Sequence, residues 1–261
     1  MGGSIPAVPS LGYKGSLDPL ITFDAGQTII ELDLDLLARR LGERGVRVAP
    51  AALAEALPAA WRRYDELVDA SRGHPWQELM ATLLSGAGVG TAEDGMDGMD
   101  GMDGIGGLVD WLWREQPRVN LWRRPIEDMV ALARELAAAG VAVAVLSNSE
   151  GRLAELLEEI GLAAPFAAIV DSGKLGIEKP DRRIFEHALA RTGRTAGVHI
   201  GDSWSADIEG ALGAGWRAVW FGRRAAPVAD PRVAVARSAA EVRAALARWG
   251  VPGVSGVPSL S

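Results

Sequence analysis

The chain has 261 residues, 48% of them hydrophobic and 23% charged, an ordinary composition for a globular protein with a buried core. The net charge of −7 argues against nucleic acid or an anionic membrane as a partner, and the lack of cysteine excludes disulfides, thiolate nucleophiles and cysteine-based zinc sites. No apolar run approaches the roughly 18 residues needed to span a bilayer, and the amino terminus lacks a signal-peptide core, so we expect a cytoplasmic protein.

Residues 1–17 are rich in glycine, serine and proline and are predicted to form a disordered leader. The first predicted strand, Leu20 to Phe23, runs straight into Asp24, and Gly26 and Thr28 follow. A short buried strand that ends in a carboxylate and a glycine turn is how an open α/β sheet presents a reactive group, because ligands bind at the carboxyl ends of its strands.

Residues 30–124 show helical rather than strand periodicity and are predicted to be an all-helical insertion. The expected helices place Leu36, Leu37 and Leu41 on one face, run from Pro50 through Val68, and span about Trp76 to Leu84 and Leu108 to Trp113. We expect the tryptophans of this segment to be core residues rather than a substrate platform. Residues 93–104 read EDGMDGMDGMDG, a repeat whose glycines weaken a helix and whose acidic spacing does not suit a calcium loop, so we predict a flexible loop there.

From Pro125 onward, helical and strand patterns alternate. The expected helices are 125–139, 151–160, 181–191, 207–214 and 240–249, and the expected strands are 141–146, 167–170, 198–200 and 218–221. This alternation predicts an α/β fold with a doubly wound parallel, Rossmann-like sheet. The core then comprises residues 18–29 and 125–249, with an α-helical cap domain inserted at 30–124 and a flexible tail at 250–261.

Polar side chains follow four of the predicted strands, namely Asp24, then Ser147 and Asn148, then Lys179, then Asp202 and Asp207. A nucleophilic carboxylate, a hydroxyl, a cation and paired acids can jointly hold a magnesium ion and a phosphoryl group. The carboxylates would otherwise repel one another and an anionic substrate, and a metal ion together with Lys179 resolves that conflict. Taken singly, Ser147, Asp202 and Asp207 would also suit the starts of the helices that follow them.

These motifs, in this order, resemble those of the haloacid dehalogenase-like (HAD) hydrolase superfamily, with a helical cap inserted after the first motif. The resemblance covers about residues 20–248 and implies a Mg²⁺ cofactor. It implies that Asp24 is the nucleophile and a metal ligand and that Gly26 lends its backbone carbonyl to the metal. Asp202 would bind magnesium directly, and Asp207 would support it.

The same resemblance implies a phosphate-binding set in the core. Ser147 would bind the phosphoryl oxygens with backbone help from Asn148, Thr28 would belong to the same set, and Lys179 would balance the charge on Asp24 and the phosphoryl group. The expected partner is a small phosphorylated substrate, and the expected reaction is its hydrolysis through a phospho-aspartyl intermediate at Asp24.

One position departs from the family's phosphatase pattern. In those phosphatases a second aspartate, two residues after the nucleophile, protonates the leaving group and then activates water, whereas this chain has Gly26 there. General acid–base catalysis contributes roughly 10²–10⁴-fold in rate, so substrates with leaving groups of low pKa would suffer least. Gln27 cannot replace the acid at neutral pH, and Glu31 and His74 are the remaining candidates.

Three alternatives follow from the missing acid. Members of the superfamily that cleave phosphonates use a cap lysine, and residues 30–124 contain none. Dehalogenases expel halide without a proton or a metal, but their fourth motif resembles Ser-Asn where this chain has Gly201 and Asp202. A catalytically weak protein that binds a phosphorylated ligand or a protein partner and regulates by cap position is the third alternative.

Overall fold

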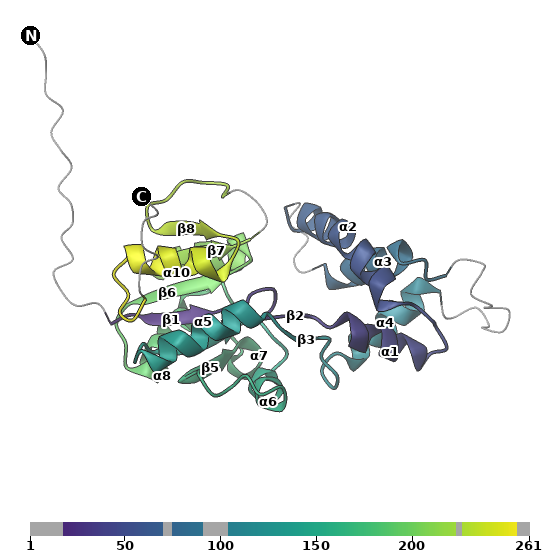
Figure 1. The fold of residues 1–261 in the computed structure, drawn as a ribbon, viewed down its shortest axis with the longest axis horizontal. Helices are drawn as coiled ribbons and strands as arrows, with labels where there is room; N and C mark the ends of the chain where they lie inside the picture. Colours follow the sequence, from purple (N-terminus) through teal and green to yellow (C-terminus); the bar gives the residue numbers. More distant parts are fainter. Residues whose placement is uncertain (1–17, 70–74, 91–103, 223–225, 255–261) are drawn as a thin grey trace, which may run out of the picture.

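A computed structural model describes residues 18–69, 75–90, 104–222 and 226–254 of the chain (Figure 1). The predicted leader 1–17, nearly all of the predicted repeat loop 93–104 and the end of the predicted tail lie outside the described residues, and so does His74. No helix in the described ranges is long and apolar enough to cross a membrane.

A parallel six-stranded sheet forms the centre of the α/β part, in the order β5-β4-β1-β6-β7-β8. Its strands are β1 (Leu20–Phe23), β4 (Val143–Ser147), β5 (Ala168–Asp171), β6 (Gly197–Gly201), β7 (Arg217–Phe221) and β8 (Val233–Ala236). Phe23 is in register with Val145 on one side and Ile200 on the other, so the residues after these central strands meet at one edge. The prediction of a doubly wound parallel sheet is confirmed.

Helices cover both faces of this sheet because its central strands alternate between two apolar clusters (Figure 1). Ile21 and Phe23 belong to the cluster with α5 (Glu127–Ala138), α6 (Leu153–Glu159) and α10 (Ala239–Arg248). Leu20 belongs to the cluster on the other face, with α8 (Arg182–Thr192) and α9 (Gly210–Gly213). A short helix, α7 (Ser172–Leu175), follows β5. Burial on both faces explains why these strands read as continuous apolar runs.

Three elements of the α/β part differ from the prediction, and one of them is the short helix α7, which was not expected. The helix expected at 207–214 is a π-helical turn, η2 (Trp204–Glu209), that continues into α9. Strand β8 was not predicted, because its four residues follow a segment without any βα periodicity. None of Ser147, Asp202 and Asp207 is an N-cap in the described part of the chain, since the N-cap of η2 is Ser203 and that of α6 is Arg152, but Asp207 does lie in the first turn of η2.

The inserted segment is not all helical, and that prediction is corrected. Strand β2 (Ile30–Leu32) pairs antiparallel with β3 (Trp122–Pro125), and this two-stranded ribbon joins the sheet to the helices (Figure 1). Each strand is too short to show a two-residue period, and β3 contains two arginines and a proline, which hid it from pattern analysis.

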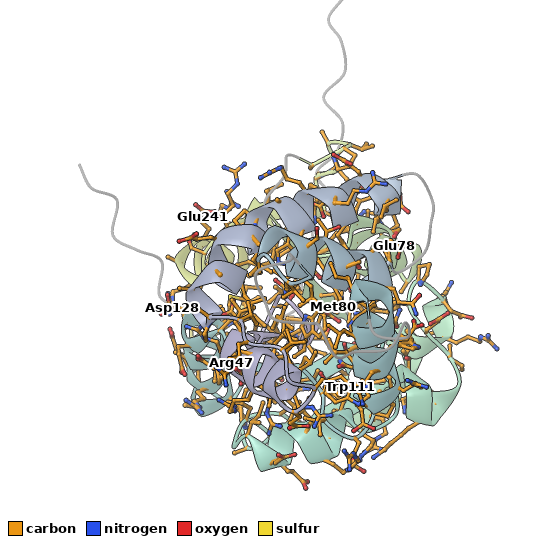
Figure 2. The ribbon with its side chains drawn as sticks, turned by 90° about the vertical axis from the view of Figure 1, so that its right-hand side faces the viewer. Arg47, Glu78, Met80, Trp111, Asp128 and Glu241 are labelled. Atoms are coloured by element: carbon orange, nitrogen blue, oxygen red, sulfur yellow. The ribbon has the colours of Figure 1, made fainter. Side chains whose placement is uncertain are left out.

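Between the two ribbon strands lie the cap helices, which are α1 (Leu34–Gly42), α2 (Pro50–Asp69), α3 (Trp76–Gly86) and α4 (Ile105–Glu115). They enclose an apolar cluster of their own, and Met80, labelled in Figure 2, is fully buried within it. Trp61 and Trp76 are buried as core residues, whereas Trp113 is 45% exposed. The cap helices therefore have a core that is separate from those of the sheet.

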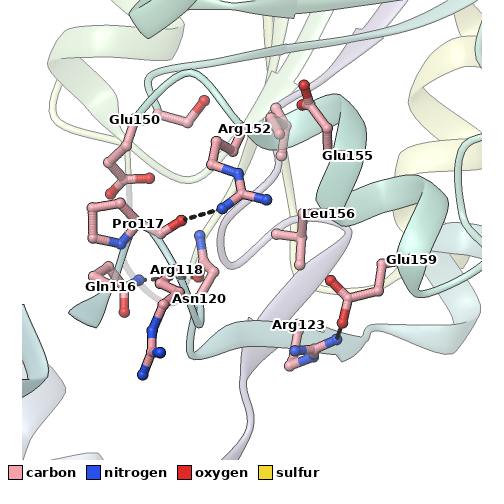
Figure 3. Close-up of a pocket in the computed structure, with 12 residues that line it drawn as sticks. Gln116, Pro117, Arg118, Asn120, Arg123, Glu150, Arg152, Glu155, Leu156 and Glu159 are labelled. Carbon is pink, nitrogen blue, oxygen red and sulfur yellow. Dashed lines mark hydrogen bonds and ion pairs between the residues drawn. The ribbon is translucent and has the colours of Figure 1, made fainter.

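A small polar pocket marks the junction between the end of the inserted segment and α6 (Figure 3). Arg123 pairs with Glu159 at 2.6 Å, and Nη1 of Arg152 donates to the carbonyl oxygen of Pro117 at 3.2 Å. Both contacts are exposed to solvent, where an ion pair contributes about 0–1 kcal/mol. These two contacts supplement the connection through β2 and β3, but they are too weak to fix the cap helices rigidly against the sheet.

Candidate active site

The structure brings three predicted acidic residues together at the carboxyl edge of the sheet. Asp24 follows β1, Asp202 follows β6, and Asp207 lies in η2, and one carboxylate oxygen of each lies within 4.8 Å of the others. Such a set of oxygen donors matches the preference of Mg²⁺, a hard cation. These residues therefore fit the magnesium ion that the sequence analysis implied.

Lys179 lies between two of these carboxylates with its side chain only 2% exposed. Its Nζ donates to Oδ1 of Asp24 at 2.6 Å, to Oδ1 of Asp207 at 2.5 Å and to the carbonyl oxygen of Leu146 at 2.9 Å. An ammonium group has three donors, so all of them are used. The buried charge is thus compensated and fixed in place.

Burial and charge act in opposite directions on these groups. For Lys179, burial disfavours the ammonium, but the carboxylates of Asp207 and Asp24 outweigh it and raise the pKa above its usual value. Burial raises the pKa of Asp24 despite the nearby ammonium. For Asp207, Lys179 and the contact with His199 outweigh burial and lower the pKa. A bound divalent cation would favour the charged, nucleophilic form of Asp24.

Asp207 is held at both carboxylate oxygens. Oδ2 accepts from the backbone N–H of Ser203 at 2.8 Å, and Oδ1 lies 3.0 Å from Nε2 of the fully buried His199. Nδ1 of His199 lies 2.8 Å from Oγ1 of Thr22 on β1, which orients the ring. A Cβ at position 201 would lie 2.3 Å from Cγ of Asp207, so a glycine is needed there.

The role of His199 was not predicted from the sequence. The residue lies in β6, and its ring is one of the groups that orient Asp207. A histidine inside an otherwise apolar buried strand, eight residues before an aspartate, was the available signal. Its partner can only be identified once the strand edge and η2 are placed together.

Asn148 uses its side-chain amide to hold the loop that carries Lys179. Its Nδ2 donates to the carbonyl oxygen of Lys179 at 3.0 Å, and its Oδ1 accepts from the backbone N–H of Lys179 at 2.8 Å. Ser147 is buried at the end of β4, next to this contact. Thr28 is fully buried, does not line the cleft described below, and its hydroxyl has no hydrogen-bond partner among the described residues. Ser147 does not line the cleft either, so the assignment of both hydroxyls to the phosphate-binding set stays a prediction.

A cleft of about 1080 Å³ opens over the acidic residues, between the sheet and the cap helices. Its wall includes aromatic side chains from both sides, namely Trp61 and Tyr64 of α2, Trp122 of β3, Trp204 of η2, and Trp220 and Phe221 of β7. Glu31, a candidate for the missing acid, lines the cleft and pairs with Arg124 at 3.4 Å. The cleft is largely apolar, with charged groups concentrated at the strand ends, as is usual for small-molecule sites.

Gly26 also lines the cleft, beside the indole of Trp122. A Cβ built there would meet Cδ1 of Trp122 at 3.7 Å and Nε1 at 4.0 Å, which are ordinary contact distances, and the glycine does not have a positive φ. Neither crowding nor backbone conformation therefore requires a glycine at this position.

Comparisons with known proteins agree with this geometry. A family model described as haloacid dehalogenase-like hydrolase matches residues 20–215. Haloacid dehalogenase-like hydrolase domain-containing protein 3 of Bos taurus is 28% identical over 208 residues, 75% of this chain and 78% of the relative. Phosphoserine phosphatase of Thermus thermophilus is 37% identical over 123 residues, covering 46% of this chain and 48% of that protein.

Among solved structures, the protein YfnB from Bacillus subtilis, bound to magnesium, has a TM-score of 0.59 at 21% identity, covering 87% of this chain and 98% of that one. At this identity the likeness shows the fold. The family model extends from β1 through η2 and so includes every residue of the acidic cluster. The chain belongs to the haloacid dehalogenase-like hydrolases.

Proposed function

We propose that the protein is a magnesium-dependent phosphohydrolase that acts on a small phosphate ester through a phospho-aspartyl intermediate at Asp24. The observation that carries the proposal is the group of Asp24, Asp202 and Asp207, with the ammonium of Lys179 between Asp24 and Asp207. Carboxylate oxygens gathered in this way beside a buried ammonium suit a site that takes a divalent cation and then an anionic substrate. A relative named phosphoserine phosphatase supports the choice of a phosphate ester.

Each residue then has a role that its contacts allow. Asp24 attacks phosphorus with Oδ2, the oxygen that accepts no hydrogen bond from the described residues, while Oδ1 stays on Lys179. Ser147 and the backbone near Asn148 hold the phosphoryl oxygens. Asp24, the carbonyl of Gly26 and Asp202 would hold a magnesium ion with support from Asp207, and the ion would supply positive charge that offsets the carboxylates and the phosphoryl group. Asp207 suits a supporting role because protein donors already occupy both its oxygens.

The glycine at position 26 affects both chemical steps. In the first step the P–O bond breaks and the leaving oxygen keeps the electron pair without receiving a proton from residue 26. In the second step water attacks the phosphoryl group on Asp24 without a base at residue 26. Loss of the general acid in the first step matters little when the leaving group is acidic. Loss of the general base in the second step slows hydrolysis of phospho-Asp24 equally for every substrate. Hydrolysis of phospho-Asp24 should therefore limit turnover of activated esters.

We further propose that residues 30–124 act as a cap that closes over the cleft and excludes water during the first step. The polar contacts of Arg123 and Arg152 at the junction lie near the surface and can break and re-form at low cost.

The bare Gly26 also favours a second function, in which the protein binds a phosphorylated ligand and turns it over slowly or not at all. A dehalogenase is less favoured, because its reaction needs no metal, whereas Asp202 completes a set of metal-binding oxygens here.

A panel of aryl and alkyl phosphates, assayed with magnesium and with EDTA, tests the proposal. We expect magnesium-dependent release of phosphate from aryl esters, little from alkyl esters, and none from Asp24→Asn. A magnesium-dependent thermal shift with inorganic phosphate but no turnover of any ester would favour the binding function. Halide release in EDTA from a 2-haloacid would favour the dehalogenase.

A further inference from the structure

The indole of Trp122 occupies the region beside Gly26 that an acidic side chain would reach. A Cβ at position 26 would lie 4.0 Å from Nε1 of Trp122. A carboxylate oxygen extends roughly 2–2.5 Å beyond its Cβ, so an aspartate at this position would place its oxygen within hydrogen-bonding reach of that N–H. A leaving-group oxygen that such an aspartate could contact is therefore also within reach of the indole N–H of Trp122.

The N–H of Trp122 is available for such a contact. Trp122 lies on β3 at the edge of the cleft and is half-buried. Its backbone N–H donates to Oδ1 of Asn120 at 2.8 Å, and its ring packs beside that of Trp76, with centroids 6.3 Å apart. The backbone of Trp122 is thus held by Asn120 and its ring by Trp76, while Nε1–H donates to no group among the residues that the structure describes.

We infer that Trp122 donates a hydrogen bond through Nε1–H to the bridging oxygen of the leaving group, in place of the acid that Gly26 lacks. This rests on the proposed phosphohydrolase function. As Asp24 attacks, the P–O bond breaks and its electron pair stays on the leaving oxygen, which the N–H stabilises. The indole keeps its proton, and the departing oxyanion leaves as such or is protonated by water.

A donor that cannot transfer its proton restricts the substrate. The indole N–H stabilises the partial negative charge on the leaving oxygen but does not neutralise it. Only alcohols acidic enough to depart as anions are therefore expelled efficiently. The preferred substrates are therefore phosphate esters of acidic hydroxyls, such as phenols. The aromatic side chains on both walls of the cleft suit a planar leaving group of that kind.

The competing explanation is that Trp122 only packs, because its ring contacts both the sheet cluster and the cap-helix cluster. Trp122→Phe separates the two roles, since it keeps an aromatic ring and removes the N–H. Trp113→Phe is the matched control, because Trp113 also packs against Trp76, with ring centroids 5.1 Å apart, but does not line the cleft.

The test is kcat/KM for a series of aryl phosphates of graded leaving-group pKa, with magnesium. Loss of one donor to a full oxyanion costs about 10²–10³-fold, and the leaving oxygen bears only part of a charge, so we expect W122F to lose about 10-fold on the least acidic phenols. It should lose almost nothing on the most acidic ones, which makes its dependence on leaving-group pKa steeper than that of wild type. W113F should match wild type in slope, and Gly26→Asp should abolish the effect of W122F.

Equal slopes for wild type and W122F would overturn the inference, and so would a uniform loss across the series, which a packing role predicts. If W122F does not fold, the indole N–H resonance of Trp122 in Asp24→Asn decides, because it should move downfield when phenyl phosphate binds, and a stationary resonance would overturn the inference. A wild-type protein without activity on any ester would instead refute the proposed function, and this inference with it.

Discussion

Replacing Lys179 by methionine tests the electrostatic account of the site. The substitution keeps much of the side-chain volume and removes the ammonium group that pairs with Asp24 and Asp207. The side chains of these two aspartates are 12% and 1% exposed. Breaking a buried ion pair by removing one partner costs about 3–5 kcal/mol, because the remaining charge is left uncompensated. We therefore expect the free energy of unfolding to fall by about 3–5 kcal/mol, together with loss of hydrolysis.

The assay is urea and thermal unfolding at neutral pH in EDTA. At about 2–4 °C per kcal/mol for a chain of this size, Lys179→Met should lower Tm by about 6–20 °C. Magnesium should return part of the loss, because a cation at Asp24, Asp202 and Asp207 offsets the same charges.

Lys174→Met is the matched control. Lys174 pairs with Glu155 at 2.7 Å, but both side chains are 50% exposed, so the change should stay below about 1 kcal/mol. If Lys179→Met were no more destabilising than Lys174→Met, the carboxylates would not depend on the lysine and our reasoning would be refuted.

Three further predictions concern the loop, the missing acid and the junction. Asn148→Ala removes two hydrogen bonds to the backbone of Lys179 and should lower kcat. It should also lower the free energy of unfolding by about 1–2 kcal/mol in urea titrations. Unchanged values for both quantities would contradict the role given to Asn148. Gly26→Asp should raise kcat/KM for alkyl phosphates by roughly 10²-fold and that for activated aryl phosphates far less, and equal gains on both classes would refute our account of the missing acid. Arg123→Ala removes the exposed pair with Glu159 and should change stability by less than about 1 kcal/mol in thermal unfolding, so a larger loss would show that this junction is a fixed interface.

The sequence predicted the parts of the fold that have strong local signals. The apolar run of β4 and the strand that ends in Asp24 were recognisable because strands buried on both faces contain few polar residues. Parallel strands bring their carboxyl ends to one edge, so the meeting of Asp24, Lys179, Asp202 and Asp207 could be expected from the sequence.

What the sequence could not predict depends on contacts between distant segments. The pairing of β2 with β3 joins the two ends of a long insertion, and neither strand has a pattern of its own. The approach of Trp122 to Gly26 follows from that pairing, so it was equally hidden. The contact of His199 with Asp207 needs the π-helical turn of η2, which brings the carboxylate back over the end of β6. The burial of Thr28, whose hydroxyl has no hydrogen-bond partner among the described residues, was equally invisible in the motif.

The most direct test of the central claim is rapid-quench analysis of the enzyme mixed with excess magnesium and an aryl phosphate that has an acidic leaving group. Transfer of the phosphoryl group to Asp24 does not need a general acid when the leaving group is acidic, whereas hydrolysis of phospho-Asp24 lacks a general base at position 26. Phospho-Asp24 should therefore accumulate. We predict a burst of aryl alcohol that approaches one equivalent per active site, with the mass of one phosphoryl group on the peptide that contains Asp24, and neither signal in Asp24→Asn. Steady turnover without a burst and without a phosphorylated peptide at any time would contradict the account.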